Sequence, residues 1–193
     1  MMLPDNASAQ QAEFEAFQQA ASYQSVLYRG RAPQIYTGLL YNGHYFWLTK
    51  EFLPGSLIFN GKHYTNVLLN IDACAQELLV QSKPGSPAVV VDRSRVTELE
   101  IGGQKFINLE LAGQKGALPG FYRIACEDPL IYQRIDKRMN TSPENVNGDT
   151  IGYEDPDYRT DVLNYFARDE RFYVLKDGKL KKISRRKARK MIR

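Results

Sequence analysis

Residue types that can bind metals or catalyse reactions are scattered along this chain of 193 residues. His44 and His63 each follow an Asn-Gly pair, one residue and two residues after the glycine respectively. A zinc site needs three or four converging ligands, and two histidines on different turns do not supply them. The sequence also has no standard phosphate-loop, dinucleotide-binding, zinc-peptidase or nucleophile-elbow motif. We therefore assign no catalytic residue and no cofactor.

An acidic stretch, "YEDPDYRTD", is the richest source of oxygen ligands. Asp155, Asp157 and Asp161 could hold a calcium ion, although the ligand order and central glycine of an EF-hand are missing. A solvated acidic loop is the alternative. Glu154 and Asp157 could instead serve acid–base chemistry in a hydrolase-like enzyme, which requires a set distance between the two carboxyl groups. The sequence does not define that distance.

The two cysteines, Cys74 and Cys126, are a candidate disulfide if the protein is exported to an oxidising compartment. Their Cα atoms would have to lie within about 7 Å of each other. Two unpaired thiols are the alternative. The sequence alone does not choose between them.

Aromatic residues gather in the first third of the chain. Tyr45, Trp47 and Tyr64 are candidate ligand-binding rings, because aromatic faces can stack on sugars or pack against a partner. Rings of this kind also build the cores of β proteins. The alternative is that they pack in the core or on the sheet.

Positive charge is concentrated at one end of the chain. Residues 179–193, "KLKKISRRKARKMIR", hold nine Lys or Arg and no acid, whereas residues 1–178 carry a net charge of about −5. An acidic body argues against a nucleic-acid footprint spread over the fold. The basic tail could contact an anionic membrane surface, or it could be a solvated helix. Its candidate contact residues are Arg185, Arg186, Lys187, Arg189 and Lys190.

Glycine-centred turn signals dominate the rest of the sequence. Two-residue hairpin turns favour Asn-Gly, Asp-Gly and Gly-Gly, because both central residues take positive φ. Such pairs, flanked by apolar runs, occur at residues 42–43, 60–61, 102–103 and 177–178, and Glu127-Asp128 indicates another hairpin. After Thr65, apolar and polar residues alternate as in a half-buried strand. The fold is therefore predicted to be mainly β, an antiparallel meander forming a sandwich or an open barrel.

The remaining segments complete the predicted organisation. Residues 1–24 are predicted to hold a signal-peptide stump and a short helix, because Phe14 and Phe17 form one apolar stripe. Residues 25–183 form a single β domain with a polar excursion at 140–161. The segment "VLNYFARDE" is interpreted as a helical turn, and "QKFINLEL" as a strand with Ile107, Leu109 and Leu111 on one face. Ser184 is an N-cap that begins a basic helix over 184–193.

Several turn and core residues carry a resemblance to a known family. They are Gly55, Phe59-Asn60-Gly61, Tyr64, Asn66-Val67, Leu69, Asp72, Phe106, Leu109, Gly120-Phe121-Tyr122 and the tail "FYVLKDGKLKKISRRKA". Over about residues 35–190 the chain resembles an uncharacterised family of β-rich exported proteins of Bacteroidetes-type bacteria. The resemblance implies the fold and export, and it implies no activity.

The N-terminus bears on the compartment. Ala7-Ser8-Ala9 followed by Gln10 has the small-x-small form of a signal-peptidase site, but no charged or apolar signal region precedes it. We expect a periplasmic or secreted envelope protein that binds another envelope protein or a glycan, through its sheet surface or long loop, without catalysis. A hydrolase-like enzyme is one alternative. The other is an intracellular adaptor whose basic tail meets nucleic acid.

Overall fold

The computed structural model describes residues 25–36, 41–142 and 163–192, and its β-strands are joined mainly by tight turns. Three of the predicted two-residue hairpins are confirmed, at residues 60–61, 102–103 and 177–178. All six central residues have φ between 51° and 76°. The Asn-Gly, Gly-Gly and Asp-Gly pairs therefore set these reversals, since such residues tolerate positive φ at the lowest steric cost.

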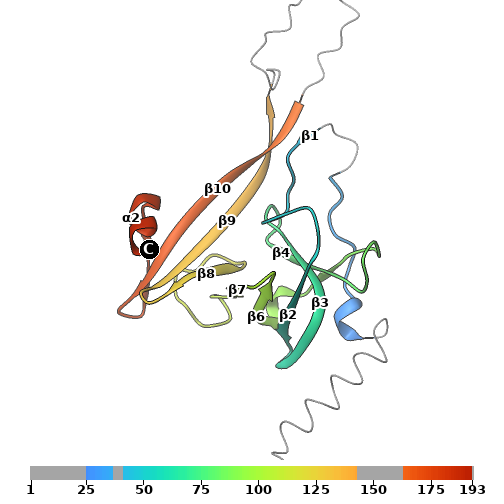
Figure 1. The fold of residues 1–193 in the computed structure, drawn as a ribbon, viewed down its shortest axis with the longest axis horizontal. Helices are drawn as coiled ribbons and strands as arrows, with labels where there is room; N and C mark the ends of the chain where they lie inside the picture. Colours follow the sequence, from blue (N-terminus) through green and yellow to red (C-terminus); the bar gives the residue numbers. More distant parts are fainter. Residues whose placement is uncertain (1–24, 37–40, 143–162, 193) are drawn as a thin grey trace, which may run out of the picture.

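Eleven strands and one α-helix make up the described fold (Figure 1). The strands of the body are β1 (Tyr41–Asn42), β2 (Leu53–Phe59), β3 (Lys62–Asp72), β4 (Glu77–Gln81), β5 (Val89–Val91), β6 (Val96–Ile101) and β7 (Gln104–Ile107). They are followed by β8 (Tyr122–Glu127), β9 (Leu130–Ser142), β10 (Leu163–Lys176), β11 (Lys179–Ile183) and the helix α2 (Arg185–Met191). The described residues also form two single-turn 3-10 helices. η1 (Val26–Tyr28) contacts β5 in space, and η2 (Arg93–Arg95) follows β5 in the sequence.

All eleven strands belong to one open sheet, with the order β1-β10-β9-β8-β7-β6-β2-β3-β4-β5 and with β11 beside β10. Almost every pairing is antiparallel, as predicted. The hairpin predicted at Asn42-Gly43 is wrong. β1 pairs in parallel with the distant strand β10, Tyr41 opposite Asn164, and the chain then runs to Phe46 before it makes a single bridge to Asp72. A suitable turn pair does not make a hairpin unless two strands flank it.

The sheet curls around one main core, and two smaller apolar clusters lie on the two faces of its β8–β11 part. The main buried cluster joins inward-facing residues of β2 to β7, including Leu57, Leu69, Ile101 and Phe106, each at most 3% exposed. β9 comes back against the β3–β4 turn, where the Lys137 N–H donates to the Ala73 carbonyl at 2.9 Å. The arrangement is therefore closer to an open barrel than to a sandwich of two sheets.

The two longest strands, β9 and β10, form a ribbon that runs diagonally away from the body in Figure 1. Twelve residue pairs join them, from Leu163↔Ser142 to Val174↔Ile131. The helical turn predicted at residues 162–170 is wrong, because residues 163–170 are part of β10. The excursion predicted at 140–161 begins later than expected, since β9 runs to Ser142; residues 143–161 lie outside the described residues.

The connection after β7 also differs from the prediction. The strand ends at Ile107, and Leu109 is buried while Leu111 is 41% exposed, so the two do not share one face with Ile107. Residues 108–120 instead form a turn-rich loop, in which the Leu118 N–H donates to the Tyr122 hydroxyl at 2.9 Å. The loop at residues 111–120 was predicted.

The C-terminal helix begins as predicted. The Ser184 hydroxyl accepts a hydrogen bond from the Lys187 N–H at 3.2 Å, which is an N-cap. Ala188 is fully buried and packs with Phe172 and Ile131 of the ribbon. The predicted N-terminal helix lies outside the described residues. Within the described ranges, no helix has the length and apolar character needed to span a membrane.

Candidate functional site

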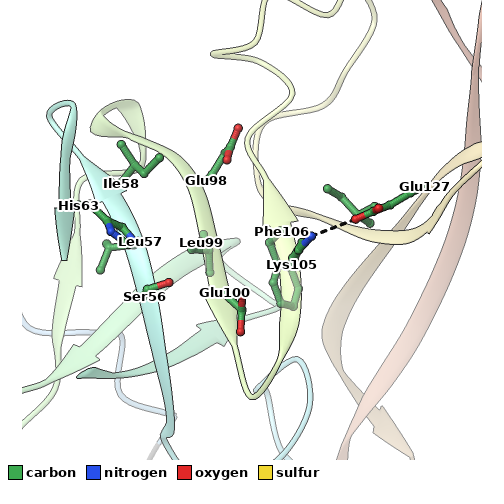
Figure 2. Close-up of a pocket in the computed structure, with 11 residues that line it drawn as sticks. Ser56, Leu57, Ile58, His63, Glu98, Leu99, Glu100, Lys105, Phe106 and Glu127 are labelled. Atoms are coloured by element: carbon green, nitrogen blue, oxygen red, sulfur yellow. Dashed lines mark hydrogen bonds and ion pairs between the residues drawn. The ribbon is translucent and has the colours of Figure 1, made fainter. Parts of the chain in front are cut away.

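A groove of about 340 Å³ runs across the outer face of the sheet, over β2, β6, β7 and β8 (Figure 2). We call it the outer groove. Its side chains include Ser56, Ile58, Glu98, Glu100, Lys105 and Ile124. They share one face because side chains alternate along a strand, so Leu57, Leu99 and Phe106 point instead into the core.

Strand register places the charged residues of the groove in a row. Ser56 lies opposite Glu100, and Glu100 lies opposite Lys105 on the other side. The Lys105 ammonium donates to Glu127 at 3.0 Å, and both side chains are more than 60% exposed. This hydrogen bond and the charge of Glu127 raise the pKa of Lys105. Such exposed pairs contribute little to stability. The Lys105–Glu127 bridge places one positive and one negative charge on one wall of the groove.

The other carboxylates of the groove form no ion pair with a described residue, although the charge of Glu100 also raises the pKa of Lys105. Glu98 and Glu100 are exposed on β6, and neither forms an ion pair within 4 Å with any described residue. His63 from β3 lies opposite Ile58 in the β2–β3 ladder and also lines the groove (Figure 2). The described residues contain no group of three or more His, Cys, Asp or Glu arranged to hold a metal ion. The groove therefore combines apolar side chains with two solvated negative charges, which suits binding of hydrogen-bond donors.

A second polar cluster lies inside the fold, around Asp72 at the end of β3. The Asp72 carboxylate accepts hydrogen bonds from the backbone N–H groups of Cys74 and Ala75 at 2.7 and 2.9 Å, which forms the β3–β4 turn. It also accepts a hydrogen bond from the Tyr36 hydroxyl at 3.1 Å. Asp72 is fully buried as a residue. The carboxylate thus satisfies three donors where the strand reverses.

Lys137 of β9 joins this cluster to the segment before β2. Its ammonium donates to the carbonyl oxygens of His44 and Phe46 at 2.7 and 2.6 Å. Its backbone N–H donates to Ala73 in the turn. One residue therefore fastens three segments that are far apart in sequence.

Burial shifts the pKa of each titratable member of the cluster in the direction that favours its neutral form. Burial, aided by the charge of Asp72, raises the pKa of the Cys74 thiol to about 11. Burial raises the pKa of Asp72 and of Tyr36, and it lowers the pKa of His44. Burial and the charge of Arg168 lower the pKa of Lys137 to about 8.

The raised pKa of Cys74 does not suit nucleophilic catalysis by its thiol. An activated cysteine needs a lowered pKa or a neighbouring base, whereas Cys74 remains a protonated thiol at neutral pH. The Lys137 ammonium is committed to two carbonyl groups. The Asp72–Lys137 cluster is therefore a structural clasp, and the outer groove is the better candidate functional site.

The structure separates the three aromatic residues predicted to bind ligand. Trp47 is 5% exposed and packs edge-to-face on Phe106 in the core. Tyr64 is 7% exposed and packs on Phe59. Tyr45 is half-buried, with its ring 4.5 Å from that of Tyr36. The interpretation as an exposed binding surface is corrected for Trp47 and Tyr64, because large rings fill the centre of the curled sheet.

The other predicted sites have different outcomes. Cys74 and Cys126 are both free thiols, which is the alternative to the candidate disulfide. They occupy different surroundings: Cys74 is in the β3–β4 turn, whereas Cys126 lies in β8 beside α2. Asp155, Asp157 and Asp161, with Glu154, lie outside the described residues. The basic tail residues, Arg185, Arg186, Lys187, Arg189 and Lys190, are all exposed on α2.

Sequence reasoning overlooked the outer groove, although one signal was available. In "ELEI", Glu98 and Glu100 alternate with Leu99 and Ile101, a pattern that predicts two carboxylates on the outer face of a strand. Nothing in the sequence indicates that β2 and β8 lie on either side of β6 and β7. The groove depends on that order of strands.

Comparison of the chain with protein-family models, with curated protein sequences and with solved structures finds no match.

Proposed function

We propose that this protein is an exported envelope protein that acts by binding, and that its ligand site is the outer groove. The observation that supports this most directly is the exposed Glu98–Glu100 pair, set among apolar side chains and unpaired within the described residues. Two unneutralised carboxylates beside Ile58 and Ile124 suit a partner that brings both positive charge and apolar surface.

The partner that fits best is a cationic segment of another protein. Lys or Arg side chains can donate to carboxylates with charge-assisted hydrogen bonds, which are about twice as strong as neutral ones. Their aliphatic stems can cover Ile58 and Ile124. The groove is shallow and solvated, so the expected affinity comes from several contacts, each of modest strength.

The chemistry of the buried cluster favours binding over catalysis. The Cys74 thiol has a raised pKa, the Asp72 carboxylate accepts three hydrogen bonds, and the Lys137 ammonium donates to two carbonyl groups, so these groups are committed to the fold. Glu98 and Glu100 are solvated rather than buried, unlike carboxyl groups that work as general acids at neutral pH. The hydrolase-like alternative depends on Glu154 and Asp157, which lie outside the described residues.

Export is part of the proposal and rests on sequence. Its support is the Ala7-Ser8-Ala9 pattern and the resemblance to exported β-rich proteins. Mass spectrometry of the protein from its native cells tests it. Export predicts a mature N-terminus near Gln10, and a protein that keeps Met1 in the cell interior would contradict it.

Binding is tested by NMR titration with a penta-lysine peptide. We expect amide shift changes at Ser56, Glu98, Glu100 and Ile124, and at least about a tenfold weaker affinity for Glu98→Gln/Glu100→Gln. The matched control is Glu110→Gln/Asp177→Asn, which removes two exposed acids far from the groove. Shift changes outside the groove, or equal loss in both variants, would contradict the assignment.

A further inference from the structure

The edge of β10 that faces away from β9 is covered at its two ends and open between them. β1 pairs with Asn164 and Tyr165 at one end, and β11 pairs with residues 172–176 at the other. Figure 1 shows β1 near one end of β10 and α2, which follows β11, near the other. No described strand lies beside residues 167–171 on this side, and we call this stretch the open edge.

Strand register shows which backbone groups point out of the open edge. In an antiparallel ladder, successive residues direct their N–H and C=O groups alternately to the two neighbouring strands. The two-residue turn at 177–178 makes Lys176↔Lys179 a hydrogen-bonded pair, so the even-numbered residues of β10 face β11 and the open edge. Lys137, opposite Arg168, accordingly donates its N–H to Ala73 and not to β10. Arg168 and Glu170 therefore direct two N–H and two C=O groups out of the open edge.

None of these four backbone groups has a hydrogen-bond partner among the residues that the structure describes. The chain turns away from the edge on both sides. After β1 it passes Gly43, whose φ is 84°, and reaches Phe46, which bridges to Asp72. After β11 it begins α2 at Ser184. A row of unpaired backbone groups of this kind is a template for another strand.

The pattern of donors and acceptors selects a polypeptide as the occupant. Alternating N–H and C=O groups are matched by the backbone of an extended chain, whereas phosphate oxygens cannot donate to the two carbonyl groups. The open edge spans about 16 Å, at about 3.3 Å per residue. β10 of a second copy has 14 residues and would run into β1 or β11. The edge therefore fits a short extended segment and excludes a second β10.

The side chains at the open edge indicate which segment fits best. Arg168 and Glu170 lie on one face of β10, and Arg168 is also directly opposite Lys137, a like charge. A carboxylate opposite Arg168 on an added strand would offset this repulsion, because opposite charges stabilise cross-strand pairs. A basic residue opposite Glu170 would extend the same pattern. Charged residues on an edge also oppose strands that lack the matching charges, so they provide selectivity.

From these observations we propose that the open edge binds a short extended segment of another polypeptide as an antiparallel strand added to β10. β11 already runs antiparallel along this edge, and antiparallel pairs are slightly more stable per residue. A basic residue of the segment then lies opposite Glu170, and an acidic residue two positions later lies opposite Arg168. The outer groove lies on other strands, so this role does not depend on the proposed function of the groove.

The first test locates the added strand. The full chain is titrated with acetyl-Thr-Lys-Thr-Glu-Val-amide to saturation, and amide hydrogen exchange is measured by NMR. We expect exchange of the Arg168 and Glu170 N–H groups to slow by at least about tenfold. Exchange at Asp169, whose N–H faces β9, should change by less than about twofold. Absence of binding, protection elsewhere, or dimerisation of the free protein that protects the same two groups would overturn the proposal.

The second test separates backbone pairing from attraction between charges. Methylation of the Lys and Glu backbone nitrogens of the peptide removes the two N–H groups that would face the open edge, and should weaken binding by at least about tenfold. The matched control is methylated on the two Thr nitrogens, which would face solvent, and should bind within about twofold of the parent peptide. Equal loss for the two methylated peptides would rule out strand addition.

The third test checks the register. Arg168→Glu should weaken binding of the parent peptide by at least about fivefold, and acetyl-Thr-Lys-Thr-Lys-Val-amide should recover most of the affinity. The matched control, Arg138→Glu, reverses an exposed arginine on β9 and should change binding by less than about twofold. Loss without recovery, or equal loss in the control, would contradict the proposed pairing. Glu98→Gln/Glu100→Gln should leave binding of the parent peptide unchanged, and a loss there would assign the peptide to the outer groove instead.

Discussion

The body of the sheet and the β9–β10 ribbon are built by different forces. Strands β2 to β7 enclose one apolar core, in which Leu69, Val80 and Val96 are fully buried. The middle of the ribbon is charged instead, and its twelve backbone-paired positions include Arg134 opposite Arg171 and Asp136 opposite Asp169. The ribbon is buried only in part: Ile131 and Ile135 of β9 are buried, whereas the charged side chains of Arg138, Arg168 and Asp169 are exposed to water.

Like charges opposite each other in a ladder should repel. The ribbon avoids this through diagonal contacts. The Asp136 carboxylate accepts hydrogen bonds from Arg134 at 2.7 Å and lies 3.2 Å from the Arg171 guanidinium, which also pairs with Asp169. Two repulsive pairs thus become one network with alternating charge. Strand pairing is therefore supported by burial in the body, and in the ribbon by ion pairs in addition to the buried side chains of Ile131, Ile135 and Phe172.

The largest expected effect is in the body. Phe106→Ala removes a ring that is 1% exposed and packs on Trp47, so it should lower the free energy of unfolding by about 3–5 kcal/mol. Chemical denaturation measures this loss. The control, Leu111→Ala, changes a side chain that is 41% exposed and should shift stability by less than about 0.5 kcal/mol. Similar losses at both positions would remove the distinction between body and surface.

A smaller effect is expected in the ribbon. Asp136→Ala leaves the Arg134 guanidinium, 6% exposed, without its main acceptor and opposite Arg171. We expect a loss of about 2–3 kcal/mol, less than for a fully buried pair because Asp136 is 23% exposed. Asp169→Ala, which removes a carboxylate that is 48% exposed, should cost less than about 1 kcal/mol. The two losses in the free energy of unfolding are measured by urea denaturation. Equal losses for the two variants would show that the network does not centre on Asp136.

The smallest effect concerns the joint between the two regions, where Lys137 fastens the ribbon to the β3–β4 turn. Its pKa is lowered from 10.5 to about 8 in the folded protein. Between these values the unfolded chain binds more protons than the folded one, so the contribution of Lys137 to stability rises with pH. The free energy of unfolding of wild type minus that of Lys137→Met should therefore increase by about 1 kcal/mol over this interval.

Using the difference between the two proteins cancels the titration of Tyr122, which opposes the trend at high pH. It does not cancel the titration of Cys74, because the charge of Lys137 is one cause of the pKa of that thiol. A difference that is flat or falls between pH 8 and pH 10.5 would show that the two carbonyl groups keep Lys137 charged in the folded state. Lys137 would then contribute to stability as a charged group, as the arginine and aspartate side chains of the ribbon do.

Much of the fold follows from local sequence. The hairpins at Asn60-Gly61, Gly102-Gly103 and Asp177-Gly178, and the cap at Ser184, are each decided by a few neighbouring residues. Errors occurred where context overrides local pattern. Residues 163–170 contain Ala, Arg and Glu, which favour helices, but a partner strand with twelve matched positions makes them β. Context also overrides the local signal at Asn42-Gly43, because β1 pairs with the distant strand β10 and forms no local hairpin.

The candidate site was less accessible to prediction. The alternation of Glu98 and Glu100 with buried residues is visible in the sequence, but their neighbours from β2 and β8 are not. For Trp47 and Tyr64 the sequence left open a ligand-binding surface or packing in the core, because aromatic type does not indicate which face of a curled sheet a ring occupies. The Asp72–Lys137 clasp joins residues 65 positions apart, and no local pattern relates them.

Local residue patterns were enough to establish where the chain reverses, which segments are extended, and that a basic helix begins after Ser184. These features depend on φ preferences and side-chain periodicity, which act over a few residues. Three other features emerge only in the folded sheet: β2 lies beside β6, β1 runs parallel to β10, and two glutamates face a groove. Such choices depend on which distant apolar faces and backbone edges satisfy one another, and that is a property of the whole sheet.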